Sequence, residues 1–246
     1  MPTIYLSPST QEKNLYVNGG TEEYWMNLIA DAMIPYLNAS GIKYVRNTPE
    51  MTAASSIRAS NAGNFDLHVA LHSNAAPENR YGMVRGTDVY YAPNSTNGRR
   101  AAQIIAQNLK QIYPIPSLVR AVPTTTLGEV TRTRAPAVLI EFAYHDNVDD
   151  ANWIKNNIEN IAANVVYSLT EYFGIPFKTP QPVRTGTVVV SSGSVNVRNR
   201  PSTNSQVIGS LYNGQTVRVL GTYLDWAIID FGGRRAYVSS DYIRIS

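Results

Sequence analysis

The sequence predicts an α/β protein, built on a mostly parallel sheet with helices on both faces, followed by a small all-β barrel. Three observations predict this arrangement. Strand-like apolar runs alternate with helical patterns over the first two-thirds of the chain, a proline-rich stretch follows, and only short β runs come after it. These observations place an α/β domain at residues 1–175, a linker at 176–184 and the barrel at 185–246.

The α/β part contains five strand-like runs and three helical patterns. The strands are predicted at residues 4–6, 43–45, 67–71, 87–91 and 137–140, and the helices at 21–39, 98–112 and 149–173, where apolar residues recur at helical spacing. Thr21 is the predicted N-cap of the first helix. Pro35 lies inside that helix and should kink or split it.

The last part of the chain has the pattern of a small antiparallel barrel. The linker carries prolines at 176, 180 and 182, which make it short and stiff. Beyond it, β runs are predicted at 187–190, 195–197, 207–211, 216–220, 226–231 and 235–238. Asn213-Gly214 and Gly232-Gly233 are hairpin-turn dipeptides.

Composition excludes several classes of function. The net charge is only +3 and the basic residues are scattered, whereas a nucleic-acid-binding surface shows a basic stripe. The absence of cysteine excludes disulfides, thiol nucleophiles and cysteine-ligated zinc. No apolar run approaches the roughly 18 residues of a membrane span. The N-terminus is predicted to be a strand and lacks the pattern of a signal peptide.

Polar residues follow two of the predicted strands, at the sheet edge where α/β proteins bind ligands. His72 follows the run 67–71, and Glu141 follows the run 137–140. Glu22 and Glu23 open the first helix. One imidazole, one carboxylate ligand and a second carboxylate as base are the plan of zinc hydrolases.

Each of these residues also has a purely structural interpretation. His72 could be a hydrogen-bonded residue of the core. A carboxylate such as Glu141 at the end of a buried strand must be paired or functional, and Arg132 or Arg134 could supply the partner. Acidic residues in a first helical turn favour the helix dipole without any further role.

Three segments give the α/β part a family resemblance. Residues 70–75 (Ala-Leu-His-Ser-Asn-Ala) and 136–142 (Pro-Ala-Val-Leu-Ile-Glu-Phe), together with 86–91, resemble the zinc-dependent N-acetylmuramoyl-L-alanine amidases of the type 3 amidase family. The resemblance spans about residues 3–173. It implies that His72 and a helix glutamate hold Zn²⁺ and that Glu141 is the catalytic acid/base. The family's helix glutamate is usually followed by asparagine four residues on, which selects Glu23, with Asn27, over Glu22.

The first metal-ligand position departs from the family pattern. The family's first strand ends in Asp-Pro-Gly-His, whereas residues 7–10 here are Ser-Pro-Ser-Thr, followed by Gln11. Gln11 therefore completes the predicted ligand set, and its amide oxygen should weaken zinc affinity. His68 lies about 13 Å from His72 along a strand, too far to bind the same ion. Glu12 and His145 are further candidates, with His145 the better one for lining the site.

The barrel resembles the bacterial SH3-like (SH3b) domain. Residues 194–202 (Ser-Val-Asn-Val-Arg-Asn-Arg-Pro-Ser) carry its signature, and the resemblance covers residues 185–246. It implies a cell-wall-binding module that raises the enzyme's effective concentration at an insoluble substrate. Candidate binding aromatics are Tyr212, Tyr223, Trp226 and Tyr237, although packing inside the barrel explains each of them equally well.

Together the two resemblances predict a peptidoglycan hydrolase. It would cleave the amide between N-acetylmuramic acid and L-alanine by zinc-activated water, with Glu141 as acid/base. We expect it to be secreted or wall-associated, as a phage endolysin or after removal of a leader. Two alternatives stay open: an amidase-fold protein that has lost its metal and acts as a wall-binding or scaffold protein, and a metallopeptidase that cuts within the stem peptide.

Overall fold

The computed structural model describes residues 1–48, 50–180, 184–223 and 225–246, with the side chain of Tyr223 outside this description. The chain divides into two compact units, Met1–Thr179 and Pro180–Ser246. Of the predicted linker at 176–184, residues 181–183 lie outside the described part. Each unit is described here by itself.

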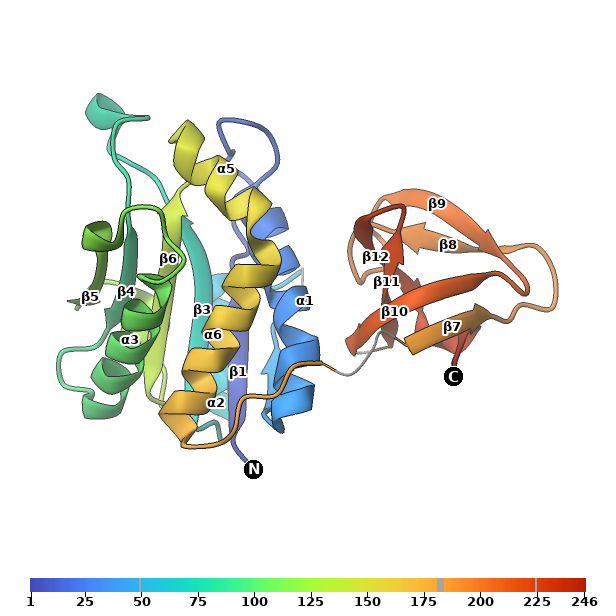
Figure 1. Ribbon diagram of the computed structural model, residues 1–246, viewed down its shortest axis with the longest axis horizontal. Helices are drawn as coiled ribbons and strands as arrows, with labels where there is room; N and C mark the ends of the chain where they lie inside the picture. Colours follow the sequence, from blue (N-terminus) through green and yellow to red (C-terminus); the bar gives the residue numbers. More distant parts are fainter. Residues whose placement is uncertain (49, 181–183, 224) are drawn as a thin grey trace. The chain divides into compact units, whose positions relative to one another are not determined.

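The first unit is built on a six-stranded mixed sheet (Figure 1). Its strand order is β2 (Lys43–Arg46), β1 (Thr3–Pro8), β3 (Leu67–Asn74), β6 (Ala137–Tyr144), β4 (Thr87–Tyr91) and β5 (Val119–Pro123). The first four strands are parallel to one another, while β4 is antiparallel to β6 and parallel to β5. The predicted α/β class with a mostly parallel sheet is confirmed.

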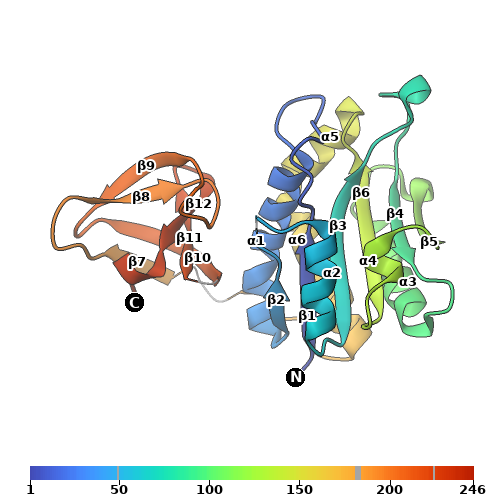
Figure 2. The same cartoon turned by 180° about the vertical axis from the view of Figure 1, so that it is seen from behind.

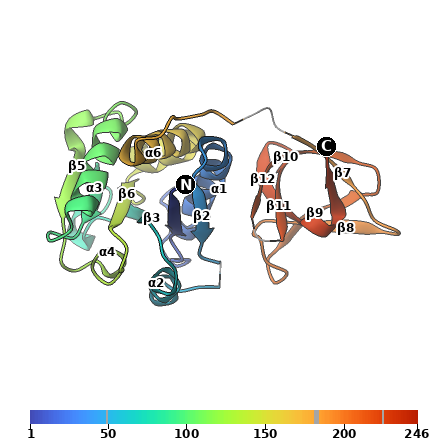
Figure 3. The same ribbon diagram turned by 90° about the horizontal axis from the view of Figure 1, so that it is seen from below.

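Helices cover both faces of this sheet (Figures 1, 2 and 3). On one face lie α1 (Glu22–Ser40), α3 (Thr96–Leu109), α5 (Val148–Asn156) and α6 (Ile158–Phe173). On the other lie α2 (Ala53–Ala62) and the single turn α4 (Gly128–Thr131). Two 3₁₀ turns, Glu78–Arg80 and Pro116–Leu118, complete the unit.

The two faces of the central strands have different characters, because side chains alternate along a strand. Val69 and Leu71 of β3 join the main apolar core with α1 and α6. Ala70 of β3 and Leu139 of β6 point the other way and pack against Val130 of α4 in a small apolar cluster. The face under α4 therefore has room for polar side chains.

Helix ends and interruptions differ in detail from the sequence prediction. Thr21 caps α1 as predicted, since its Oγ1 accepts a hydrogen bond from the backbone N–H of Tyr24 at 3.1 Å. Of the two effects predicted for Pro35, a kink or a split, the split is wrong, because α1 runs as one helix from Glu22 to Ser40. The predicted helix 149–173 is two helices that meet at Asn157.

The second unit is an antiparallel β structure. Its sheet order is β13 (Ile243–Ile245), β7 (Arg184–Val188), β10 (Thr216–Tyr223), β11 (Trp226–Phe231), β12 (Arg234–Ser239), β8 (Ser194–Arg198) and β9 (Val207–Tyr212). A 3₁₀ turn, Ser240–Tyr242, precedes β13. The core consists of small branched side chains, among them Val188, Val197, Ile229 and Val238. The described residues contain no helix long and apolar enough to cross a membrane.

Candidate functional site

Four ionisable residues form a row across four neighbouring strands. In the strand register His72 of β3 lies opposite Glu141 of β6, Glu141 lies opposite Asp88 of β4, and Asp88 lies opposite Arg120 of β5. Residues directly opposite each other project from the same face of a sheet. This row lies on the face covered by α4.

His72 is buried between two carboxylates that come from opposite sides. Its Nδ1 lies 2.8 Å from Oε1 of Glu22, at the start of α1, and its Nε2 lies 3.0 Å from Oε2 of Glu129, in α4. Burial by itself would lower the pKa of His72, but the hydrogen bonds and negative charges of Glu129 and Glu22 raise it well above the usual value. In the absence of a metal the ring is therefore an imidazolium held at both nitrogens.

The carboxylate that contacts His72 belongs to Glu22, whereas the asparagine spacing selected Glu23. Both side chains are buried, and successive residues of a helix point about 100° apart. Asn27, four residues after Glu23, does not contact the Glu23 carboxylate in this bond: its Nδ2 donates a hydrogen bond to the main-chain carbonyl of Glu23 at 2.8 Å. Helix phase thus directs the Glu22 carboxylate to the histidine.

Glu22 is held by several donors. Its Oε2 accepts a hydrogen bond from Nδ2 of Asn14 at 2.6 Å. Burial would raise the pKa of Glu22, but hydrogen bonds from His72, Asn14 and the hydroxyl of Ser9 keep it below its ordinary value. This shift of the pKa favours the ionised form of Glu22.

Glu129 is a site residue that the sequence analysis missed, as are Asp88 and Arg120 of the row. Its Oε1 accepts a hydrogen bond from Ser7 Oγ at 2.5 Å and lies 3.3 Å from Nε2 of His68, so that one carboxylate bridges His68 and His72. His68 is in turn stacked on Tyr5, with ring centroids 5.3 Å apart. The available signal was the apolar pair Leu127 and Val130 around Glu129, which anchors the turn on the sheet.

Glu141 has the environment of a general base. Its Oε2 is buried and has no hydrogen-bond partner among the described residues. Burial raises its pKa to about 7, His72 opposes the shift, and the carboxylates of Glu22 and Asp88 add to it. This carboxyl group can therefore exchange a proton near neutral pH.

The alternative that Glu141 forms a structural ion pair with Arg132 or Arg134 is wrong for the described residues. The guanidinium of Arg134 bonds the main-chain carbonyl of Asn61 instead. The Arg132 carbonyl accepts a hydrogen bond from the Asn61 side chain at 2.8 Å, which places this segment on α2. Glu141 thus keeps its carboxylate for the row of ionisable residues.

The remaining predicted candidates lie in the loops around the row. Gln11 is exposed, and its Oε1 accepts a hydrogen bond from Nδ2 of Asn14 at 3.1 Å, so its side chain is linked to Glu22 through Asn14. Glu12 is exposed in the same loop. His145 is buried, with Nδ1 3.1 Å from Oγ of Ser73, and it stacks on Tyr16.

The donors present match zinc in kind and fall short in number. A carboxylate and an imidazole face each other at Glu22 and His72, and both are ligands that zinc takes. A carboxylate on the second ring nitrogen, as Glu129 provides, is the usual partner of a metal-bound histidine. In the described part of the chain, however, no group of three or more His, Cys, Asp or Glu side chains is placed to hold a metal ion.

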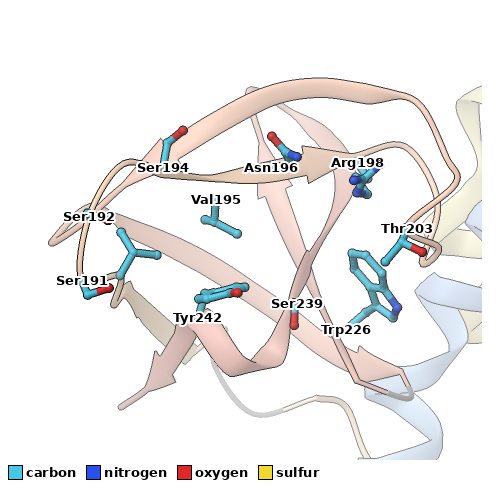
Figure 4. A pocket seen from close by; sticks show the side chains of 11 residues that line it. Ser191, Ser192, Ser194, Val195, Asn196, Arg198, Thr203, Trp226, Ser239 and Tyr242 are labelled. Atoms are coloured by element: carbon cyan, nitrogen blue, oxygen red, sulfur yellow. The ribbon is translucent and has the colours of Figure 1, made fainter.

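The second unit carries a separate cavity of about 360 Å³ (Figure 4). It is lined by the ring of Trp226 from β11, the ring of Tyr242 and the guanidinium-bearing side chain of Arg198, with serine, threonine and asparagine side chains between them. Among the other candidate aromatics, Tyr237 is buried in the barrel and Tyr212 is exposed. The side chain of Tyr223 lies outside the described residues.

Comparisons with known proteins agree with this geometry. Residues 9–171 match the family model of N-acetylmuramoyl-L-alanine amidases, and residues 193–244 match the bacterial SH3 domain. A curated relative, the uncharacterized protein YfhK of Bacillus subtilis, is 33% identical over 58 residues. That match spans 34% of the relative's length and 23% of this chain.

Solved amidase structures share the fold of the first unit. The N-acetylmuramoyl-L-alanine amidase of Clostridium difficile 630 has a TM-score of 0.64 at 16% identity and covers 70% of this chain and 97% of its own. The amidase of Mycobacterium smegmatis has a TM-score of 0.62 at 15% identity, with the same two coverages. At these identities the structures establish the fold, and the family model covers more than half of the chain. The chain therefore belongs to the N-acetylmuramoyl-L-alanine amidase family, with a bacterial SH3 domain after the catalytic fold.

Proposed function

We propose that this chain hydrolyses the amide bond between N-acetylmuramic acid and L-alanine in peptidoglycan, with Glu141 as the acid/base. The observation that carries the proposal is the environment of Glu141: a buried carboxyl with a pKa of about 7, in register with His72 at the carboxyl edge of the parallel strands. A group with this pKa takes a proton from water at neutral pH and returns it to the departing amine.

We further propose that Glu22 and His72 hold zinc through Oε1 and Nδ1. When bound, the ion would polarise the lactyl-amide carbonyl and acidify its water ligand. Glu129 keeps Nε2 of His72 engaged, which leaves Nδ1 as the ligand atom. Since these are two protein ligands where the family has three, we expect a weaker zinc affinity than that of an ordinary member.

The test compares the wild-type chain with Glu141→Gln on purified peptidoglycan. We expect the wild type to release amino groups from the wall, to lose this activity with a chelator and to regain it with zinc. Glu141→Gln should lower turnover at least 100-fold while wall binding is retained. Glu171→Gln, an exposed glutamate of α6, is the matched control and should keep full activity. Near-normal release by Glu141→Gln would contradict the proposed role.

A second candidate function is that of a wall-binding protein with an impaired amidase fold. The observation that favours it is the replacement of the first ligand histidine by hydroxyl side chains, with Ser9 hydrogen-bonded to Glu22. The same samples separate the two functions. If the chain sediments with walls but neither binds zinc nor releases amino groups, its function is that of a wall-binding protein. Mass spectrometry of the fragments would distinguish an amidase from a peptidase that cuts within the stem peptide.

We propose that the second unit attaches the enzyme to the bacterial wall through the cavity between Trp226 and Tyr242. Aromatic rings give apolar contact with sugars and peptide side chains, and the hydroxyl and guanidinium groups of the lining satisfy polar groups. Attachment raises the local concentration of the catalytic site at an insoluble substrate. The wall is accordingly the proposed place of action.

A further inference from the structure

The row of ionisable residues ends in a cation whose role the hydrolytic mechanism leaves open. Arg120 stands on the edge strand β5, two strands from Glu141 and on the same face of the sheet. Its side chain is 64% exposed, whereas that of Asp88 beneath it is only 6% exposed. The row thus runs from a buried general base to an accessible guanidinium.

Asp88 fixes the direction of this guanidinium. The carboxylate of Asp88 accepts hydrogen bonds from Nε at 2.9 Å and from Nη2 at 3.0 Å, so a two-point contact holds the Arg120 side chain in one orientation. This contact uses one edge of the guanidinium fork. The other edge, with both hydrogens of Nη1, is left for a second planar anion.

The distance along the row suits a substrate anchor. Neighbouring strands lie about 4.8 Å apart, so the backbones of Arg120 and Glu141 are separated by roughly 10 Å. An extended residue spans about 3.5 Å, and two of them span about 7 Å. With the scissile amide at Glu141, the second residue of the stem peptide comes within reach of the long Arg120 side chain.

The charges around Glu141 add a reason for a cation at this place. Three carboxylates, those of Glu22, Asp88 and Glu129, act on Glu141 against the single positive charge of His72. Such a site disfavours an anionic peptide unless a positive group meets the peptide's charge. Arg120 supplies this charge on the accessible side of the row.

We propose that Arg120 binds a free carboxylate on the second residue of the stem peptide and so makes the enzyme selective for substrates that carry this charge. The inference rests on the proposed function, because it takes Glu141 as the position of the scissile amide. Arg120 is thus a specificity-determining residue on β5 that makes no contact with the reacting bond.

The test uses two soluble muramoyl peptides that differ at one group: the second residue carries either a free carboxylate or the corresponding amide. Affinity is measured by calorimetry in the Glu141→Gln background, so that the ligand binds without being hydrolysed. The kcat/KM values are measured in the background that retains Glu141. We expect the carboxylate ligand to bind about tenfold more tightly than the amide. Arg120→Gln should abolish this preference, because it weakens the binding of the carboxylate ligand and leaves that of the amide ligand unchanged. The ratio of kcat/KM between the two substrates should change in the same way.

Two further variants guard against an effect of leaving Asp88 without its partner. Arg120→Lys keeps a positive charge beside Asp88 but lacks the fork, and should retain the fold while losing most of the preference. The double variant Asp88→Asn with Arg120→Gln removes both charges and should show no preference. Equal binding of the two ligands by the chain in which Asp88 and Arg120 are intact overturns the inference and leaves the amidase proposal intact. An unchanged preference in Arg120→Gln does the same. Binding of neither ligand contradicts both proposals.

Discussion

At the scale of single residues, the proposed role of Glu141 as acid/base depends on its pKa. The base must be ionised to accept a proton, and burial raises its pKa to about 7. We expect kcat/KM to rise with pH and to level off above about pH 7. Asp88→Asn removes a nearby negative charge, so it should move this rise to lower pH. A pH–rate profile of both proteins on a soluble muramoyl peptide is the measurement, and an identical midpoint would contradict the assigned interaction.

The same carboxyl group should reduce the stability of the fold at alkaline pH. Between its unfolded pKa of 4.5 and its folded pKa of about 7, the unfolded chain loses the proton first, so the free energy of unfolding falls as pH rises through this window. Glu141→Gln removes the ionisable group. We expect it to stabilise the protein by ~1–3 kcal/mol at pH 8 and by little at pH 4. Urea unfolding of both proteins at the two pH values measures the difference in unfolding free energy. A lower stability of Glu141→Gln than of wild type at pH 8 would contradict the burial of an unpaired charge at Glu141.

At the scale of elements, the four-residue turn α4 is important because it carries Glu129. Four residues cannot form a stable helix by themselves, so tertiary contacts must hold the turn. Packing of Leu127 and Val130 on the sheet supplies them, and Glu129 is thereby placed over His68 and His72. The turn is the outer wall of the histidine site.

Removal of the Glu129 carboxylate should therefore affect both stability and the orientation of His72. Glu129→Ala leaves two buried histidines and Ser7 without their acceptor, and we expect it to cost about 3 kcal/mol of unfolding free energy. Glu129→Gln keeps the shape and should cost less. Urea unfolding gives the free energies, and ring ¹⁵N shifts of His72 report whether Nε2 stays engaged. If Glu129→Ala had the same unfolding free energy as Glu171→Ala, the proposed stabilising contacts of Glu129 with His68 and His72 would be contradicted.

The strength of the local pattern decided which elements could be predicted. The strands 87–91 and 226–231 have the predicted bounds, because apolar alternation and flanking turns define them locally. The helix at 53–62 was missed, since it is rich in alanine and serine and has no apolar stripe. Its N-terminus at Thr52 carries a capping box with Ser55, where serine stands in place of the usual glutamate or glutamine.

At the scale of the whole molecule, one chain carries two compact units that match different families. We expect Trp226→Ala to weaken sedimentation of the full chain with purified walls about tenfold and to leave hydrolysis of soluble muramoyl peptides unchanged. Tyr212→Ala is the matched control, because this ring is 58% exposed and lies outside the cavity lining. Equal loss in both variants would assign wall binding to general surface aromatics.

The sequence by itself determined the fold class, the change from α/β to all-β character, and the positions of His72 and Glu141. These features are local: each residue directly follows an apolar run, although the strands β3 and β6 continue past His72 and Glu141. The carboxyl-terminal parts of neighbouring parallel strands meet at one edge of a sheet. Only the tertiary structure decided which glutamate meets His72, that Glu129 closes the site, and that Asp88 and Arg120 continue the row. Those contacts depend on helix phase and on cross-strand register between residues 32 to 57 positions apart, which no local pattern encodes.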